Sequence, residues 1–181
     1  MDLKKDRENL SIEGKNGISF LLSGLIIWIV ITVIFSTNLT LIQKNIYMFF
    51  STGLMFPLSI FISKQIKAEW KFENHPLGKL GLYLNLAQFM YFPILAWAFQ
   101  HNPIQVVSFF AVITGAHFFP YGWLYDARAY TVLSPITSIT IVIISWNITI
   151  DQLWLVPLIT VIFLSILVFW LFVDYRKKIN S

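Results

Sequence analysis

Cysteine is absent from the 181-residue sequence, and charged residues are scarce. Without a thiol, the chain can form no disulfide, no cysteine-ligated metal site and no covalent thiol intermediate. Only 12% of the residues are charged, whereas soluble domains carry about 25%. Hydrophobic residues make up 57% of the chain, and the mean hydropathy is +0.70. This composition is typical of an integral membrane protein.

The gaps between charged residues are long enough for membrane-spanning helices, which need roughly 20 apolar residues to cross about 30 Å of hydrocarbon. The window from Leu80 to Tyr125 is too long for one span, and the turn signal QHNP (100–103) interrupts it. There Asn102 can cap a helix that begins at Pro103. The sequence therefore predicts an all-α protein, a bundle of six transmembrane helices in a single membrane domain (1–181). The predicted spans are 17–36, 46–64, 77–99, 104–124, 129–148 and 153–173, between tails 1–16 and 174–181.

Basic residues occur almost entirely in the tails and in alternate connections. Of the 13 Lys and Arg residues, twelve fall on one side of the predicted topology, and only Lys44 falls on the other. Short loops rich in Lys and Arg stay in the cytoplasm. We therefore expect both termini to be cytoplasmic and the protein to lie in the cell membrane. Because topology accounts for the net charge of +4, we expect the lipid bilayer as a partner and no nucleic acid.

Two short motifs recur at a similar offset. GKNG (14–17) precedes the first predicted span, and GKLG (78–81) opens the third. TGLMFP (52–57) lies in the second span, and TGAHFFP (114–120) lies in the fourth. Many small transporter-like folds are built from repeated units. The motifs support the hypothesis of a duplicated two-helix hairpin, with chance similarity as the alternative.

Three Phe-Pro pairs lie inside the predicted spans, at Phe56-Pro57, Phe92-Pro93 and Phe119-Pro120. Proline removes a backbone donor and clashes with the preceding turn, so each pair predicts a kink. A kink either improves packing or acts as a hinge for a moving helix, and the sequence leaves both interpretations open.

The imidazole of His117 is the one histidine side chain predicted at membrane depth, where ionisable groups are costly and indicate function by default. At a rise of about 1.5 Å per residue, His117 lies at nearly the same depth as Asn85 and Gln88 of the neighbouring span. Thr114 and Tyr121 share the helical face of His117. The sequence therefore predicts a polar layer in the inner half of the bundle, and these five side chains are the predicted solute-binding residues.

Three functions stay open. In the first, the polar layer binds or transports a small solute, and the protein is a homo-oligomer because six short helices enclose little volume. In the second, the same groups bond to one another, and the protein is a non-catalytic accessory protein that stabilises a partner. In the third, a membrane-embedded enzyme acts on lipid with His117 or Asp126 as acid or base.

Motifs that would favour the enzyme are absent: the sequence has no glycine-rich phosphate loop, serine elbow or paired intramembrane carboxylates. We therefore expect no catalytic residue, no metal and no cofactor. Asp126, in the short connection after the fourth span, is expected to cap the fifth span or to pair with Arg128.

Four segments resemble an uncharacterised family of small bacterial integral membrane proteins. They are GAHFFPYGWLY (115–125), GLMFPLS (53–59), PLGKLGLYLNLAQ (76–88) and MYFPI (90–94). The likeness runs from about Gly14 to Tyr130. It implies a bacterial cytoplasmic membrane protein, and it implies no activity, catalytic residue or ligand.

Overall fold

The computed structural model describes residues 3–72 and 75–180 of the chain. Residues 1–2 and 181 of the predicted tails, and residues 73–74 of the second predicted connection, lie outside the described part. Throughout the described residues, every regular element is a helix. The predicted all-α class is therefore confirmed.

Five helical segments are long and apolar enough to cross a membrane: Lys15–Phe35, Gly78–His101, Pro103–Leu124, Arg128–Ser145 and Ile150–Lys178. Helices Leu41–Thr52 and Met55–Ile66 meet at a short break with a bend of 44°. If this bent pair counts as one span, the number of spans is six. The structure thus contains five or six membrane-length helices in its described part.

The individual elements subdivide these segments. The α-helices are α1 (Leu3–Glu13), α2 (Ile18–Phe35), α3 (Leu41–Thr52), α4 (Met55–Ile66), α5 (Gly78–Ala87), α6 (Phe92–His101), α7 (Val106–His117), α8 (Phe119–Leu124), α9 (Arg128–Ser145) and α10 (Leu155–Lys178). The 3₁₀ turns are η1 (Lys15–Gly17), η2 (Gln88–Tyr91), η3 (Pro103–Gln105) and η4 (Ile150–Gln152).

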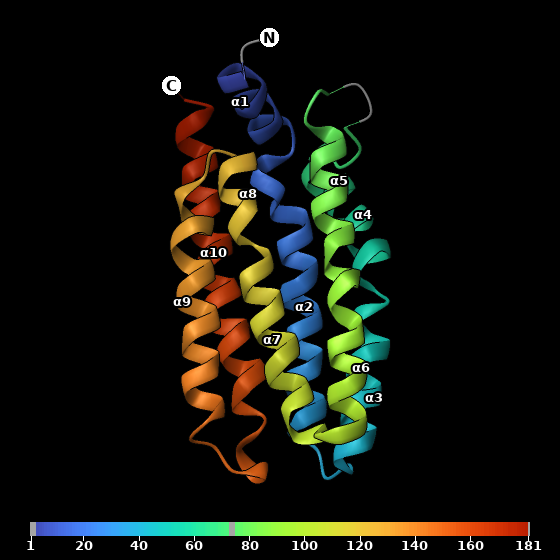
Figure 1. Ribbon diagram of the computed structural model, residues 1–181. Coiled ribbons are helices and arrows are strands. Elements are labelled where there is room, and N and C mark those ends of the chain that lie inside the picture. Colours follow the sequence, from blue (N-terminus) through green and yellow to red (C-terminus); the bar gives the residue numbers. More distant parts are fainter. Residues whose placement is uncertain (1–2, 73–74, 181) are drawn as a thin grey trace.

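The long helices run up and down the bundle, and both chain ends lie at the same end of it (Figure 1). We call this the terminal end. The α4–α5 and α8–α9 connections also lie there, whereas the α2–α3, α6–α7 and α9–α10 connections lie at the opposite end. The connections and tails that carry the twelve basic residues therefore share one end of the molecule.

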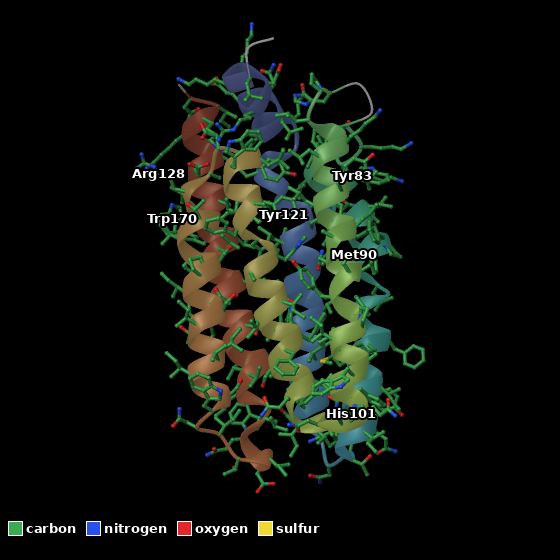
Figure 2. The ribbon with its side chains drawn as sticks, viewed as in Figure 1. Tyr83, Met90, His101, Tyr121, Arg128 and Trp170 are labelled. Atoms are coloured by element: carbon green, nitrogen blue, oxygen red, sulfur yellow. The ribbon has the colours of Figure 1, made fainter. Side chains whose placement is uncertain are left out.

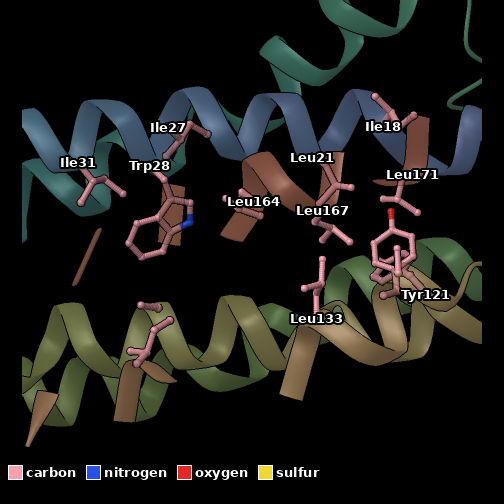
Figure 3. Close-up of a cluster of buried hydrophobic side chains, with 14 of the residues drawn as sticks. Ile18, Leu21, Ile27, Trp28, Ile31, Tyr121, Leu133, Leu164, Leu167 and Leu171 are labelled. Carbon is pink, nitrogen blue, oxygen red and sulfur yellow. The ribbon is translucent and has the colours of Figure 1, made fainter. Parts of the chain in front are cut away.

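Helix α2 lies at the centre of the bundle, between α10 on one side and α3 and α4 on the other. Its side chains Leu21, Trp28 and Ile31 are almost completely buried. Figure 3 shows them pointing into the interior of the bundle, together with Leu164 and Leu167 of α10. In lipid, such helices associate through close van der Waals packing and interhelical hydrogen bonds rather than through release of water.

Three of the membrane-length segments are interrupted. The breaks lie between α3 and α4, at η2 between α5 and α6, and at Phe118 between α7 and α8. A Phe-Pro pair follows each break within the first three residues of the next helix. Because proline cannot donate to the preceding turn and its ring crowds that turn, each pair ends the helix before it. The predicted kinks thus form as breaks.

The turn predicted at QHNP forms, but without the expected cap. Helix α6 ends at His101 and η3 begins at Pro103, while the side chain of Asn102 makes no capping hydrogen bond. Instead, the buried Asn45 of α3 donates from Nδ2 to the carbonyl of Pro103 across 2.8 Å. Helix α3, which contains the start of the second predicted span (46–64), begins at Leu41.

A network of polar contacts closes the terminal end around Asn16, which is fully buried. Its amide Nδ2 donates to the carbonyl of Leu171 across 3.1 Å and to Asp174 Oδ2 across 3.0 Å. The phenol of Tyr130 donates to the carbonyl of Asn16 across 2.7 Å. Lys178 Nζ donates to Asn16 Oδ1 across 3.1 Å and forms an ion pair with Asp174. The network joins η1, α9 and α10.

Asp126 has a different partner from the one expected. Its Oδ1 lies 2.7 Å from Nη2 of Arg7, on helix α1, whereas the α9 N-terminus at Ala127 has no side-chain cap. Arg7 also donates from Nε to the carbonyl of Trp123 and stacks on that indole at 4.9 Å. The expectation that Asp126 caps α9 or pairs with Arg128 was wrong, because α1 docks over the α8–α9 connection.

Candidate functional site

One cavity of about 380 Å³ contains all five predicted solute-binding residues in its wall. The seven helices α2 to α8, the turns η1 and η2 and the start of α9 contribute to it. The wall residue Tyr121 lies in the half of the bundle toward the terminal end, and Met90, next to the wall residue Phe89, lies near the middle (Figure 2). The cavity thus runs from mid-bundle toward the terminal end. Solute binding by the five residues stays a prediction.

The helix breaks position the polar side chains. Gln88 is the first residue of η2, and His117 is the last residue of α7 before its break. The imidazole of His117 meets the ring of Tyr121 edge-on, with centroids 5.2 Å apart and planes at 70°. Pro120 prevents α7 from continuing, so α7 ends and α8 begins between these two side chains.

The other two polar residues bond only within their own helices. Thr114 Oγ1 donates to the carbonyl of Phe110 across 2.9 Å, and Asn85 Nδ2 donates to the carbonyl of Gly81 across 3.2 Å. Within residues 3–72 and 75–180, no hydrogen bond joins two of the five predicted side chains. The interpretation that these groups exist to bond to one another across helices therefore lacks the contacts it requires.

The hydroxyl of Tyr121 is the clearest unsatisfied group in the wall. The side chain is 6% exposed, and its oxygen has no hydrogen-bond partner in the described protein. An unsatisfied buried polar group costs about 1–3 kcal/mol, and such groups are uncommon in native proteins. The hydroxyl can both donate and accept a hydrogen bond. A molecule in the cavity that donates or accepts a hydrogen bond would therefore satisfy it.

Aromatic side chains form most of the wall: twelve of its 23 residues are Phe, Tyr or Trp, and none is Asp, Glu, Lys or Arg. At the terminal end, the rings of Tyr121, Tyr125 and Tyr130 pack with centroids 6.0–6.2 Å apart. Burial raises the pKa of the Tyr125 phenol above its usual range, so this phenol stays protonated at physiological pH. The wall is therefore uncharged and mostly apolar.

Asp126 does not line the cavity and is paired with Arg7, so His117 has no carboxylate beside it in the wall. Among the described residues, no three His, Asp or Glu side chains gather closely enough to hold a metal ion.

Several wall residues were not predicted from the sequence. Gly17 and Gly24 of the α2 segment and Tyr125 and Tyr130 at the terminal end all line the cavity. The motif TGLMFP also contributes, through Thr52, Gly53, Met55 and Phe56, and the motif TGAHFFP contributes Thr114, His117 and Phe118. The similar offsets of these motifs were the signal that could have pointed to both segments. The duplication itself stays a hypothesis.

The chain matches, over residues 3–174, a family of unknown function, DUF7010. It belongs to this family. The match contains every residue of the cavity wall, and membership agrees with the predicted resemblance to an uncharacterised family. No curated protein and no solved structure matches the chain.

Proposed function

We propose that this member of the family is a multi-pass membrane protein that binds a small solute in the cavity between its interrupted helices. The observation that carries the proposal is the meeting of three helix breaks at one cavity whose wall holds an unpartnered tyrosine hydroxyl. Transport requires binding at this position first. It also requires that the same cavity open to the two membrane faces in turn.

Helix breaks at membrane depth support a binding role on physical grounds. A helix satisfies its own backbone groups, and hydrocarbon offers no replacement partners. Backbone carbonyls that lose their helical donor at a proline are therefore tolerated there only where protein buries them or where they line a cavity. Interrupted helices beside a midplane site are a common arrangement in secondary transporters. Here the residues flanking the breaks, among them Gln88, His117 and Gly53, line the cavity.

The orientation of the site belongs to the same proposal. The basic tails and connections share the terminal end, and the positive-inside rule assigns that end to the cytoplasm. The polar side chains Asn85, His117 and Tyr121 then lie in the cytoplasmic half of the membrane. The rival role as a non-catalytic accessory protein is less well supported, because the polar side chains do not join the helices to one another.

Cysteine accessibility tests the proposal directly, since the natural chain contains no thiol. We compare Thr114→Cys, which places a thiol in the cavity wall, with Ala111→Cys, one turn earlier on α7. Ala111 is fully buried and does not line the cavity. In protein reconstituted into nanodiscs, N-ethylmaleimide should modify Thr114→Cys much faster than Ala111→Cys. Equal reactivity in dodecyl sulfate shows that both thiols are intact.

Equal protection of the two thiols in the folded protein would contradict the proposal, because a cavity that admits a solute must also admit a reagent of this size. Faster reaction at Thr114→Cys shows that the cavity is accessible, whatever molecule it binds in the cell.

A further inference from the structure

The way into the cavity is marked by the wall residues that are also exposed at the protein surface. Among the lining residues, all of them in the described part of the chain, four are exposed: Phe50, Gly53, Phe56 and Phe89. Gly53 lies in the α3–α4 break, Phe50 and Phe56 flank that break, and Phe89 lies in η2. The opening is therefore on the side of the bundle, between two helix breaks.

The opening lies at the depth of the hydrocarbon core if the segments span a membrane. The α3–α4 break falls at the middle of residues 41–66, and η2 falls at the middle of Gly78–His101. The middle of a span is about 15 Å from either edge of the hydrocarbon. A molecule that passes Gly53 or Phe89 therefore comes from lipid and not from water.

Both ends of the cavity are closed. Toward the terminal end, Tyr125 is 8% exposed and Tyr130 is 2% exposed, and the Tyr130 phenol is bonded to the buried Asn16. Toward the opposite end, Trp28 is 2% exposed and stacks on Phe110 with centroids 5.2 Å apart. The side opening differs from both ends, because the side chains of Phe50 and Phe89 are exposed there.

The chemistry of the wall restricts the occupant. A carboxylate, phosphate or ammonium group inside the cavity would lose its hydration and find no Asp, Glu, Lys or Arg in the wall, which costs several kcal/mol. Aromatic surface suits an apolar body, and the few polar groups near Tyr121 and His117 suit one hydrogen-bonding end. Pockets of this volume and composition bind small molecules.

We propose that the cavity takes an uncharged, largely apolar molecule from the hydrocarbon of the membrane, through the opening between the α3–α4 break and η2. Its hydrogen-bonding end meets the Tyr121 hydroxyl. This inference rests on the proposed solute-binding function and names the class of solute and the route of entry.

Four probes with the same aromatic body test the class of solute. They are 2-naphthol, naphthalene, 2-naphthoate and 2-naphthyltrimethylammonium, which differ in hydrogen bonding and charge. Each is equilibrated with nanodiscs that contain the protein and with empty nanodiscs, so that partition into lipid is subtracted. We expect 2-naphthol to bind about tenfold more tightly than naphthalene, because one hydrogen bond is gained. The two charged probes should not exceed the empty-disc level.

Variants locate the bound probe. Tyr121→Phe should lower the affinity for 2-naphthol to that for naphthalene and leave naphthalene binding unchanged. Gly24→Leu should abolish binding of both, because an added side chain at this wall position extends into the cavity. The matched control is Tyr83→Phe, which removes a phenol that is 64% exposed on α5 and should change nothing. Tighter binding of either charged probe, or binding that survives Gly24→Leu, would overturn the assigned solute class.

The route is tested with Thr114→Cys and two maleimides, neutral N-ethylmaleimide and a membrane-impermeant sulfonated maleimide. Entry from lipid predicts that only the neutral reagent reacts. If the sulfonated reagent reacts as fast, the cavity has an aqueous entrance and the side route is wrong, although solute binding stands. If neither reagent reacts faster than at Ala111→Cys, the proposed function itself fails.

Discussion

The phenol of Tyr130 lies 2.7 Å from the main-chain carbonyl of Asn16, 114 residues earlier in the chain. This hydrogen bond joins the turn before α2 to the first turn of α9. The ring of Tyr130 forms part of the cavity wall, and the side chain of Asn16 is bonded to α10. One buried contact thus connects the closed end of the cavity to three separate parts of the chain.

Removing that hydroxyl should destabilise the fold. Tyr130→Phe keeps the ring but leaves the carbonyl of Asn16 without the phenol as a donor, and we expect the free energy of unfolding to fall by about 1–2 kcal/mol. Titration with dodecyl sulfate in mixed micelles, followed by tryptophan fluorescence, measures the change. Tyr83→Phe serves as the control because Tyr83 is exposed. Equal stabilities of the two variants would show that the Tyr130 bond contributes nothing.

Two glycines of the same segment should respond in opposite ways to alanine. Gly17 has φ +74°, and a Cβ there would lie 2.9 Å from Cε2 of Tyr125. Strain and crowding together should make Gly17→Ala destabilising by about 1–3 kcal/mol. A Cβ at Gly24 meets only Met55 Cε, at 3.6 Å, so Gly24→Ala should be neutral or gain up to about 1 kcal/mol of helix propensity. Thermal unfolding in detergent measures both. A Gly17→Ala protein as stable as Gly24→Ala would show that position 17 accepts a side chain without strain.

Much of the architecture could be predicted from the spacing of charges. Charged side chains are costly in hydrocarbon, so long intervals without them had to be helices, and the turn at QHNP followed from the excess length of one interval. The helical rise gave His117, Asn85 and Gln88 similar predicted depths, and all three line one cavity. Such arguments succeed because they depend on local pattern and on the thickness of the membrane.

The contacts between distant segments could not be predicted in this way. The polar tail containing Arg7 has the composition of a solvated segment, yet Arg7 meets Asp126 and Trp123 across more than 100 residues. The sequence around Asn16 does not predict its hydrogen bonds to α10, because the packing of α2 against α10 determines which groups Asn16 meets. The same limit applies to Tyr130 and Gly17, which became wall residues only through the arrangement of helices.

The orientation can be measured with two further cysteines. Asn38 is exposed in the α2–α3 connection, and Gln65 is exposed near the end of α4 at the terminal end. In intact bacterial cells, a membrane-impermeant maleimide should label Asn38→Cys and should label Gln65→Cys only after permeabilisation, because the basic end stays in the cytoplasm. The reverse pattern would place the terminal end outside and would invert the proposed topology.

The ion pair between Arg7 and Asp126 should contribute little by itself. The side chain of Asp126 is 59% exposed and that of Arg7 is 18% exposed, and exposed pairs contribute about 0–1 kcal/mol. Arg7 has further contacts with Trp123, so Arg7→Ala should destabilise the protein more than Asp126→Asn. A double-mutant cycle isolates the coupling of the pair, and 1 M NaCl should reduce that coupling.

A coupling above about 2 kcal/mol that salt leaves unchanged would mean that the pair is effectively desolvated, contrary to the exposure of Asp126. Asp126→Asn bears on function as well, because this carboxylate pairs with Arg7 on α1 and does not line the cavity. Binding of 2-naphthol by Asp126→Asn should therefore equal that of the unaltered protein. A loss of binding without a loss of stability would place Asp126 in the site and would revive the membrane-embedded enzyme that uses it as an acid or base.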